Sequence, residues 1–295
     1  MIGAMMEATR MTRPFTQVDV FTEVALRGNP LAVVHDADGL SDAQMQAFAR
    51  WTNLSETSFL LRANDPGADY RVRIFTPARE LPFAGHPTLG SCHAWLERGG
   101  VPRQANEVVQ QCGVGLVRIR RDAASPTPRL AFAAPPLRKT GAVAPAVIAQ
   151  IARSLQIEAA AIQASQWVDN GPGWVAVMLA SRDAVLALQP DYAAMRGLEL
   201  GVVAPWTGAD ADAQFEVRAF VPDAGGYEDP VTGSLNASLA QWLIGAGLAP
   251  SRYVASQGTV LGRAGRVHVE RDDGENGAIW VGGASVSCVR GHVAF

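Results

Sequence analysis

Runs of β-branched and aromatic residues alternate along this chain with apolar residues at helical spacing, which predicts strands separated by single helices. The predicted strands are Thr16–Phe21, Leu31–Val34, Thr57–Leu61, Tyr70–Phe75, a set within Val108–Ile119, and Phe215–Phe220. The predicted helices follow Ser41, begin close to His86, contain Val147–Leu155 and follow Asp229. Regular alternation of strands and single helices is typical of an α+β fold.

The first helix has the clearest predicted boundaries. Ser41 and Gln44 form a capping-box pattern directly before residues with helical periodicity. The helix should end near Asn53, and a strand is predicted from Thr57. Glu56 is therefore left at a junction between loop and strand.

Two segments far apart in the chain resemble each other. Tyr70–Pro77 reads YRVRIFTP, and Phe215–Pro222 reads FEVRAFVP. Each is followed by a polar loop and then by a similar tail, GHPTLGS in the first copy and EDPVTGS in the second. Four positions match in the tails: His86 with Asp229, Pro87 with Pro230, Gly90 with Gly233, and Ser91 with Ser234. A weaker echo pairs GNPLAVV (Gly28–Val34) with GPGWVAV (Gly171–Val177). Two copies of one unit predict two similar lobes, with a site where the two turns face each other.

Chain length agrees with two lobes. At about 150 residues per domain, 295 residues suffice for two domains with their own cores. The proline-rich segment Ser125–Pro136 is the best candidate linker. The predicted lobes are therefore residues 12–133 and 134–295, and a return of the final strand to the first lobe stays open. Residues 1–11 are expected to be a disordered leader.

Composition narrows the classes of partner. A net charge of −3 with no basic run argues against nucleic acid. Three cysteines, odd in number and far apart, fit a reducing compartment better than a disulfide framework. No apolar run approaches the roughly 20 residues needed to span a bilayer. We therefore expect a cytoplasmic protein with no nucleic-acid or membrane partner.

Glu56 is the first candidate for proton transfer. Its neighbours Trp51, Leu54 and Phe59 are apolar, and a carboxyl group in such a setting has a raised pKa and can act as a general acid and base. The alternative is a surface glutamate at the start of a strand, and the local sequence leaves both interpretations open.

His86 and Asp229 each stand immediately before a proline, and we expect both at the N-terminus of a helix. The free amides and the helix dipole attract an anion there. Each residue alone could be a simple cap. Two such turns together would direct two sets of amides into one cleft, which suits a small carboxylic acid.

Other chemistry finds little support in the sequence. Cys92 falls on the apolar stripe of its predicted helix, and adjacent helical residues such as Cys92 and His93 do not face each other, so a packed thiol is expected. Cys112 and Cys288 are expected in the core as well. The histidines have no metal-ligand spacing, and no dinucleotide or phosphate-binding glycine motif occurs. We predict no metal site and no cofactor.

Six segments, in the same order along the chain, resemble the phenazine-biosynthesis isomerase family, often called PhzF-like. They are VDVFT (Val18–Thr22), GNPLAVV (Gly28–Val34), NLSET (Asn53–Thr57), RIFTPARELPFAGHPTLG (Arg73–Gly90), EDPVTGS (Glu228–Ser234) and SQGTVLGRAGRV (Ser256–Val267). The resemblance implies the diaminopimelate epimerase fold, with two lobes that are each a curled β-sheet around a central helix. It also implies an active site between the lobes and no cofactor.

The resemblance assigns roles to particular residues. It implies that Glu56 transfers the proton, and that the supporting and substrate-binding groups are His86, Asp229, Gly85, Gly233 and Ser234. In the related epimerases two cysteines flank the substrate as acid and base. The two central turns here contain no cysteine, which favours isomerisation through a single carboxylate over two-thiol racemisation.

The sequence therefore predicts a cofactor-independent, PhzF-like isomerase of a small cyclic or amino carboxylic acid. Two alternatives stay open: an amino-acid racemase or epimerase on the same fold, and a metabolite-binding protein without catalysis. The expected partner is the small acid itself, and a homodimer also stays open.

Overall fold

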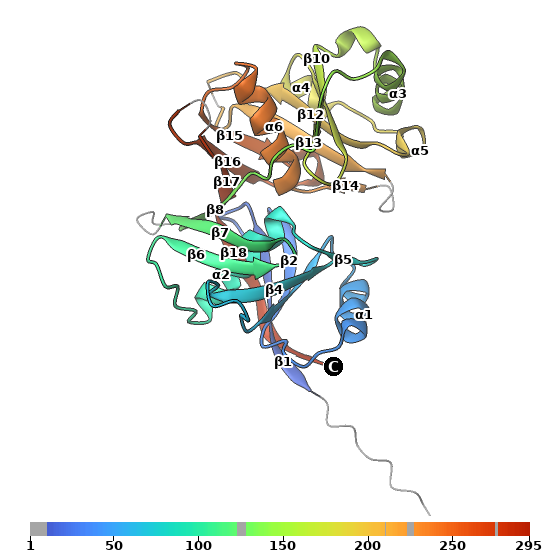
Figure 1. The fold of residues 1–295 in the computed structure, drawn as a ribbon. Helices are drawn as coiled ribbons and strands as arrows, with labels where there is room; N and C mark the ends of the chain where they lie inside the picture. Colours follow the sequence, from blue (N-terminus) through green and yellow to red (C-terminus); the bar gives the residue numbers. More distant parts are fainter. Residues whose placement is uncertain (1–10, 123–127, 210, 223–226, 275–276) are drawn as a thin grey trace, which may run out of the picture.

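The computed structural model describes residues 11–122, 128–209, 211–222, 227–274 and 277–295. They form two lobes, each with a curled sheet around one helix, α2 in the first and α6 in the second (Figure 1). The α+β class and the two-lobed architecture are thus confirmed. Apart from Met11, the expected leader of residues 1–11 lies outside the described residues.

The elements of the first lobe are β1 (Thr12–Val20), β2 (Asn29–Val34), α1 (Asp42–Thr52), β3 (Thr57–Leu61), β4 (Tyr70–Phe75), β5 (Glu80–Leu81), α2 (Gly85–Glu97), β6 (Glu107–Cys112), β7 (Gly115–Asp122) and β8 (Arg129–Ala133). Those that follow are β9 (Lys139–Gly141), α3 (Pro145–Leu155), β10 (Ala164–Asp169), β11 (Trp174–Met178), α4 (Arg182–Leu186), α5 (Tyr192–Met195), β12 (Glu199–Pro205), β13 (Phe215–Val221), β14 (Tyr227–Asp229), α6 (Gly233–Gly245), β15 (Arg252–Gln257), β16 (Gly265–Arg271), β17 (Ile279–Gly283) and β18 (Ser285–Ala294). Short 3₁₀ turns lie at Ala159–Ala161 and Thr259–Leu261.

The two lobes repeat one strand order. In the first, β2 is antiparallel to β1 and parallel to β3, and β4 is antiparallel to β3 and parallel to β6. In the second, β11 is antiparallel to β10 and parallel to β12, and β13 is antiparallel to β12 and parallel to β15. The strands β4 and β13 hold the YRVRIFTP and FEVRAFVP runs, so the predicted equivalence of these segments is confirmed.

Two strand pairings connect the lobes. β8 of the first lobe pairs with β17 of the second, and the C-terminal strand β18 pairs with β1 of the first. In Figure 1 the red β18 runs from the upper lobe down along β1. The proline-rich segment that we interpreted as a linker contains β8, so that interpretation was wrong for Arg129–Ala133. Alternating burial along β8, with Leu130 and Phe132 inside, explains why it forms a strand.

The central helices are apolar on nearly every side because the curled sheets surround them. Their side chains belong to one apolar cluster that continues through both lobes. A separate cluster packs α1 on the first sheet, and another packs the α3–α5 region on the second. In the described part of the chain, no helix has both the length and the apolar character required to cross a membrane.

Candidate active site

Glu56 is presented by the short turn between α1 and β3. The capping box of Ser41 and Gln44 begins α1, as predicted, and α1 ends at Asn53 in the left-handed conformation with φ 54°. Hydroxyl groups of Thr52 and Thr57 are 3.0 Å apart across the turn. Since β3 begins at Thr57, the turn fixes the backbone on both sides of Glu56.

Glu56 and His86 form a close pair. Glu56 Oε2 lies 3.4 Å from His86 Nε2, and the two side chains are 17% and 6% exposed. Burial, and to a smaller extent the nearby charge of Asp229, together raise the pKa of Glu56 to about 8. Burial lowers the pKa of His86 to about 3. At neutral pH the pair is therefore mainly a protonated carboxyl group beside a neutral imidazole, not an ion pair.

The first turns of α2 and α6 meet at two glycines. A Cβ added to Gly85 would lie 3.2 Å from the Gly233 Cα and 2.8 Å from a ring atom of Phe132. A Cβ added to Gly233 would lie 3.2 Å from both Gly85 Cα and His86 N. Glycine at both positions lets the two backbones come this close, because an added Cβ would force its neighbours to shift by a few tenths of an ångström.

The N-cap residues Ala84 and Thr232 make no side-chain cap hydrogen bond. The first-turn N–H groups of both helices have no intrahelical acceptor, and a helix N-terminus with such groups is suited to an anion. Because α2 and α6 meet at their N-termini, two helix ends that are each suited to an anion lie next to each other.

Asp229 has a far more polar environment than Glu56. Asn29 donates a hydrogen bond to Asp229 Oδ1 at 3.0 Å, and the Thr232 hydroxyl lies 2.5 Å from Oδ2. Burial raises the pKa of Asp229 to about 6, whereas the hydrogen bonds from Thr232 and Asn29 act to lower it.

Asp229 does not stand at the start of a helix, so that prediction was wrong. It ends β14, and α6 begins four residues later at Gly233 with Thr232 as its N-cap. Asp229 is extended because it pairs with Ala219 of β13.

The repeat therefore has a different register in its tails. The helix starts match as Ala84-Gly85-His86 with Thr232-Gly233-Ser234, so all four predicted pairs in the tails were wrong. His86 and Ser234 are the equivalent residues, each second in its helix.

Ser234 is held by the β10–β11 turn of its own lobe. Trp174 Nε1 donates to Ser234 Oγ at 3.0 Å, and Asn170 Nδ2 donates to the Ser234 carbonyl at 3.0 Å. Because the hydroxyl accepts from Trp174, its own proton is available to donate to a bound molecule. The structure thus brings Glu56, His86 and Asp229 together with Gly85, Gly233 and Ser234 around the two helix starts.

A model of the phenazine biosynthesis-like family matches residues 18–291, which is nearly the whole chain. The chain belongs to the PhzC-PhzF family. The antisense-enhancing sequence 1 of Schizosaccharomyces pombe is 34% identical to it over 94% of this chain and 97% of its own length. The trans-2,3-dihydro-3-hydroxyanthranilate isomerase of Pseudomonas aeruginosa is 32% identical over 88% of this chain and 90% of its own.

A PhzF-family crystal structure from Enterococcus faecalis has 26% identity and a TM-score of 0.77, and the alignment covers 96% of this chain and 99% of that one. The predicted family resemblance is therefore confirmed, and the chain is an enzyme of the isomerase class.

Sequence reasoning missed several polar residues around Asp229 in this PhzF-family chain. Asn29, Asn236 and Gln257 are essentially unexposed. Asn29 donates to the Asp229 carboxylate, Gln257 donates to the Asp229 carbonyl, and Asn236 donates to Gln257. A signal existed for two of them, because Asn29 lies in the GNPLAVV segment and Gln257 in the SQGTVLGRAGRV segment.

The three cysteines of this PhzF-family chain are free thiols. Cys92 is fully buried on α2, as predicted, and burial raises the pKa of its thiol. Cys112 and Cys288 are only partly buried, so neither lies fully in the core as expected, although Cys112 packs against the main apolar cluster. Within the described ranges, no group of three or more His, Cys, Asp or Glu side chains could hold a metal ion.

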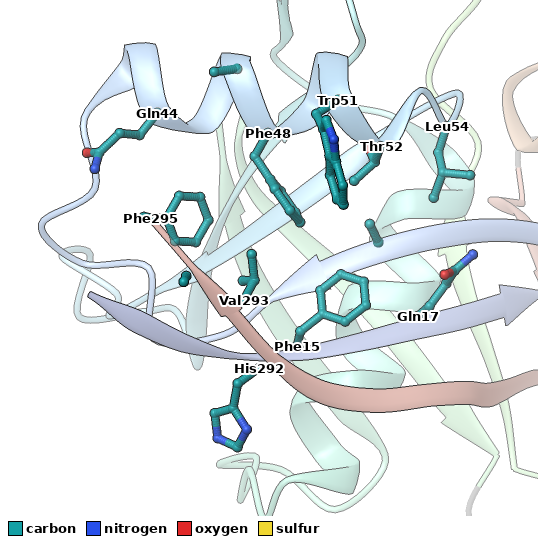
Figure 2. Close-up of a pocket in the computed structure, with 13 residues that line it drawn as sticks. Phe15, Gln17, Gln44, Phe48, Trp51, Thr52, Leu54, His292, Val293 and Phe295 are labelled. Atoms are coloured by element: carbon teal, nitrogen blue, oxygen red, sulfur yellow. The ribbon is translucent and has the colours of Figure 1, made fainter. Parts of the chain in front are cut away.

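A groove of about 890 Å³ lies elsewhere, between α1 and the strands β1 and β18. Figure 2 shows the aromatic rings of Phe48 and Trp51 pointing from α1 toward Phe15, with Phe295 at one end. None of the six predicted site residues lines this groove. The predicted site residues therefore lie around the two helix starts and not in this groove.

Proposed function

We propose that this PhzF-family isomerase acts on a small cyclic or amino carboxylic acid without a cofactor, with Glu56 as the single proton carrier. The observation that supports this most strongly is the placement of Glu56. Its carboxyl group, with a pKa of about 8, lies 3.4 Å from neutral His86 at the meeting of two helix N-termini. An acid and base with a pKa near the working pH is the most effective kind.

In this proposal, the first-turn N–H groups of α2 and α6 bind the substrate carboxylate, and the Ser234 hydroxyl donates to a neighbouring polar group. Ionised Glu56 takes a proton from a carbon activated by conjugation. The electron pair of the broken C–H bond moves into the conjugated system. Glu56 then returns a proton to another carbon, so that the product is an isomer and the enzyme is unchanged.

His86 and Asp229 support this transfer in different ways. Neutral His86 can hydrogen-bond to Glu56 or to the substrate in either tautomer. The negative charge of Asp229 disfavours ionisation of Glu56 and so makes ionised Glu56 a stronger base. A positioned acid and base contributes typically about 10²–10⁴-fold, and alignment within the closed site would supply the remainder.

The name of one relative supplies the first candidate substrate. The Pseudomonas aeruginosa relative is named for trans-2,3-dihydro-3-hydroxyanthranilate, which is a cyclic amino acid with a conjugated carboxylate. The two-thiol racemase alternative has less support, because Cys92, the cysteine nearest to a helix start in sequence, is a buried thiol with a raised pKa.

The test is incubation with this acid and with a panel of cyclic and amino carboxylic acids in D₂O, followed by mass and NMR analysis. The proposal expects deuterium at a carbon together with a shifted double bond. Deuterium at a stereocentre with no movement of a double bond would support the racemase instead. Tight binding without deuterium uptake would contradict catalysis and support a metabolite-binding protein.

A further inference from the structure

The side-chain amide of Gln257 has only one orientation that satisfies its neighbours. Gln257 lies on β15 and is fully buried. Its Oε1 accepts from the Thr232 backbone N–H at 3.0 Å, and a backbone N–H can only donate. Its Nε2 therefore faces the Asp229 carbonyl at 3.1 Å and the Thr232 hydroxyl at 2.9 Å, and donates to both.

The orientation of Gln257 fixes the direction of the Thr232 hydroxyl. A threonine hydroxyl has one proton to donate. Since Thr232 Oγ1 already accepts from Gln257, its proton is directed to Asp229 Oδ2, 2.5 Å away. A short O–H to carboxylate contact of this kind is a strong, charge-assisted hydrogen bond.

Asn29 fixes the other oxygen of Asp229 in the same way, but from the first lobe. Its Nδ2 donates to the Val231 carbonyl at 2.9 Å, and a carbonyl can only accept, so the amide orientation is determined. The same nitrogen donates to Asp229 Oδ1 at 3.0 Å. Asn29 is fully buried, and both oxygens of Asp229 are thus acceptors of defined donors.

These contacts differ from those of Glu56, whose Oε2 has no hydrogen-bond partner among the described residues. We propose that Asn29, Thr232 and Gln257 are positioning residues that keep Asp229 an acceptor-only, charged carboxylate, whose charge makes Glu56 a stronger base. The catalytic consequence rests on the proposed function. The charge state of Asp229 does not, because burial and these donors set it with no substrate involved.

Several other charged or titratable groups surround Asp229. They are Glu56 before β3, His86 on α2, Glu228 on β14 with its partner Arg218 on β13, and Asp19 on β1. Arg218 binds Glu228 through two nitrogens, which balances the charge adjacent to Asp229 in the chain. Asp19 Oδ2 accepts from the Gly28 N–H and so supports the turn that precedes Asn29. None of these groups donates to Asp229, which leaves Thr232 and Asn29 as the donors to remove.

The test is an infrared titration of carboxyl groups without substrate, with bands assigned by their loss in Asp229→Asn and Glu56→Gln. Thr232→Val removes the hydroxyl donor at nearly constant shape, and Thr232→Ser keeps it. Thr88→Val is the matched control, because Thr88 is an equally buried hydroxyl at the start of α2 that does not contact Asp229. Asn29→Ala removes the second donor independently.

In wild type and in Thr232→Ser, Asp229 should ionise near pH 6. Loss of a hydrogen bond to a charged group should raise this pH by about one to two units in Thr232→Val, and in Asn29→Ala as well. Thr88→Val should leave it unchanged. The proposal is overturned if both donor variants leave the Asp229 titration in place, or if Thr88→Val moves it equally. Because no substrate is used, failure of the proposed isomerisation would leave these outcomes readable.

Discussion

The two helix starts at the centre of the molecule share one scaffold. We call Ala84–Thr88 the α2 start and Thr232–Asn236 the α6 start. In each, the fourth residue of the helix bonds back to the carbonyl of the N-cap residue and to a buried glutamine from a neighbouring strand. At the α2 start, Thr88 Oγ1 donates to Ala84 O at 2.9 Å and accepts from Gln110 Nε2 at 3.1 Å. At the α6 start, Asn236 Nδ2 donates to Thr232 O at 2.9 Å and to Gln257 Oε1 at 2.8 Å.

The carboxyl groups beside the two starts have different environments. Asp229 receives hydrogen bonds from Asn29 and Thr232, and its pKa is raised only to about 6. Glu56 is buried beside neutral His86, and its pKa is raised to about 8. Similar scaffolds thus keep one carboxyl group charged and the other protonated near neutrality, a separation typical of acid–base sites.

The largest expected effect comes from removing the proton carrier. Glu56→Gln is nearly isosteric and can still hydrogen-bond, but its amide cannot take up and return a proton. We expect turnover to fall by about 10²–10⁴-fold or more, with little change in ligand affinity. Turnover and deuterium uptake from D₂O should fall together. The exposed Glu158→Gln makes the same chemical change on the surface and should keep both. Near-normal turnover in Glu56→Gln would mean that His86 or Asp229 carries the proton instead.

A smaller effect is expected when the two starts are pushed apart. In Gly233→Ala the new Cβ would lie 3.2 Å from backbone atoms of Gly85 and His86, which cannot yield as a flexible side chain would. Overpacking should lower the free energy of unfolding by about 1–3 kcal/mol. The required shift is a few tenths of an ångström, and a misplacement of about 1 Å costs about 10²-fold in rate, so turnover should fall by less than about 10²-fold.

Gly245→Ala at the other end of α6 is the matched control. Nothing lies within 4 Å of its added Cβ, so stability and turnover should hold or improve slightly. Equal losses in both variants would show that the contact between the starts is not the cause. Chemical denaturation and initial-rate kinetics measure the two quantities.

The sequence predicted the framework around the site well. The bounds of β3 and β4 match the predicted segments Thr57–Leu61 and Tyr70–Phe75. The alternation of apolar and polar residues and the β-branched residues that favour a strand lie within the segment itself, so the sequence shows them directly. The Ser41 capping box likewise depends on residues three apart. Glu56 could be singled out because its place follows from these neighbours.

The register of the repeat could not be read from the tails. Proline recurs in both tails but with different roles, since Pro87 lies inside the first turn of α2 and Pro230 lies three residues before α6. Glycine recurs for different reasons too. A Cβ at Gly90 would meet Leu31 at 2.6 Å, whereas Gly233 faces Gly85. Matching letters therefore aligned residues that do not occupy equivalent positions.

The polar network around Asp229 was also beyond local reasoning. Asn29 lies 202 residues from Val231, whose carbonyl fixes its amide. No periodicity or spacing connects residues so far apart, and a buried asparagine looks like any loop asparagine in the sequence. Only the packing of the two lobes brings its two N–H groups to their acceptors.

The unusual pKa of Glu56 should also appear in stability. Its pKa in the folded protein, about 8, exceeds the usual 4.5, so the folded state loses stability as pH rises from about 4.5 to 8. Gln does not ionise. We expect Glu56→Gln to be more stable than wild type by about 2–4 kcal/mol at pH 8, with the difference vanishing near pH 4. Urea denaturation at both pH values checks this, and an equal difference at the two values would contradict the raised pKa.

The smallest expected effect is a shift in the pH profile. The kcat/KM of wild type should rise with pH, reach half of its maximum near pH 8 as Glu56 ionises, and level off above that pH. In Asp229→Asn the charge that raises the pKa of Glu56 is lost, so the profile should level off at a lower pH, by about one unit. The position of the profile, not its height, is the readout, since Asp229→Asn also weakens the site. An unchanged position would mean that the two carboxyl groups do not interact.

The most direct measurement of the difference between the two starts is the infrared spectrum of the substrate-free enzyme at pH 7. With a pKa of about 8 for Glu56 and about 6 for Asp229, wild type should retain a protonated carboxyl band. That band should be absent in Glu56→Gln and should retain its intensity in Glu158→Gln. A wild-type spectrum with no protonated carboxyl band at pH 7, or a band that survives in Glu56→Gln, would contradict the account.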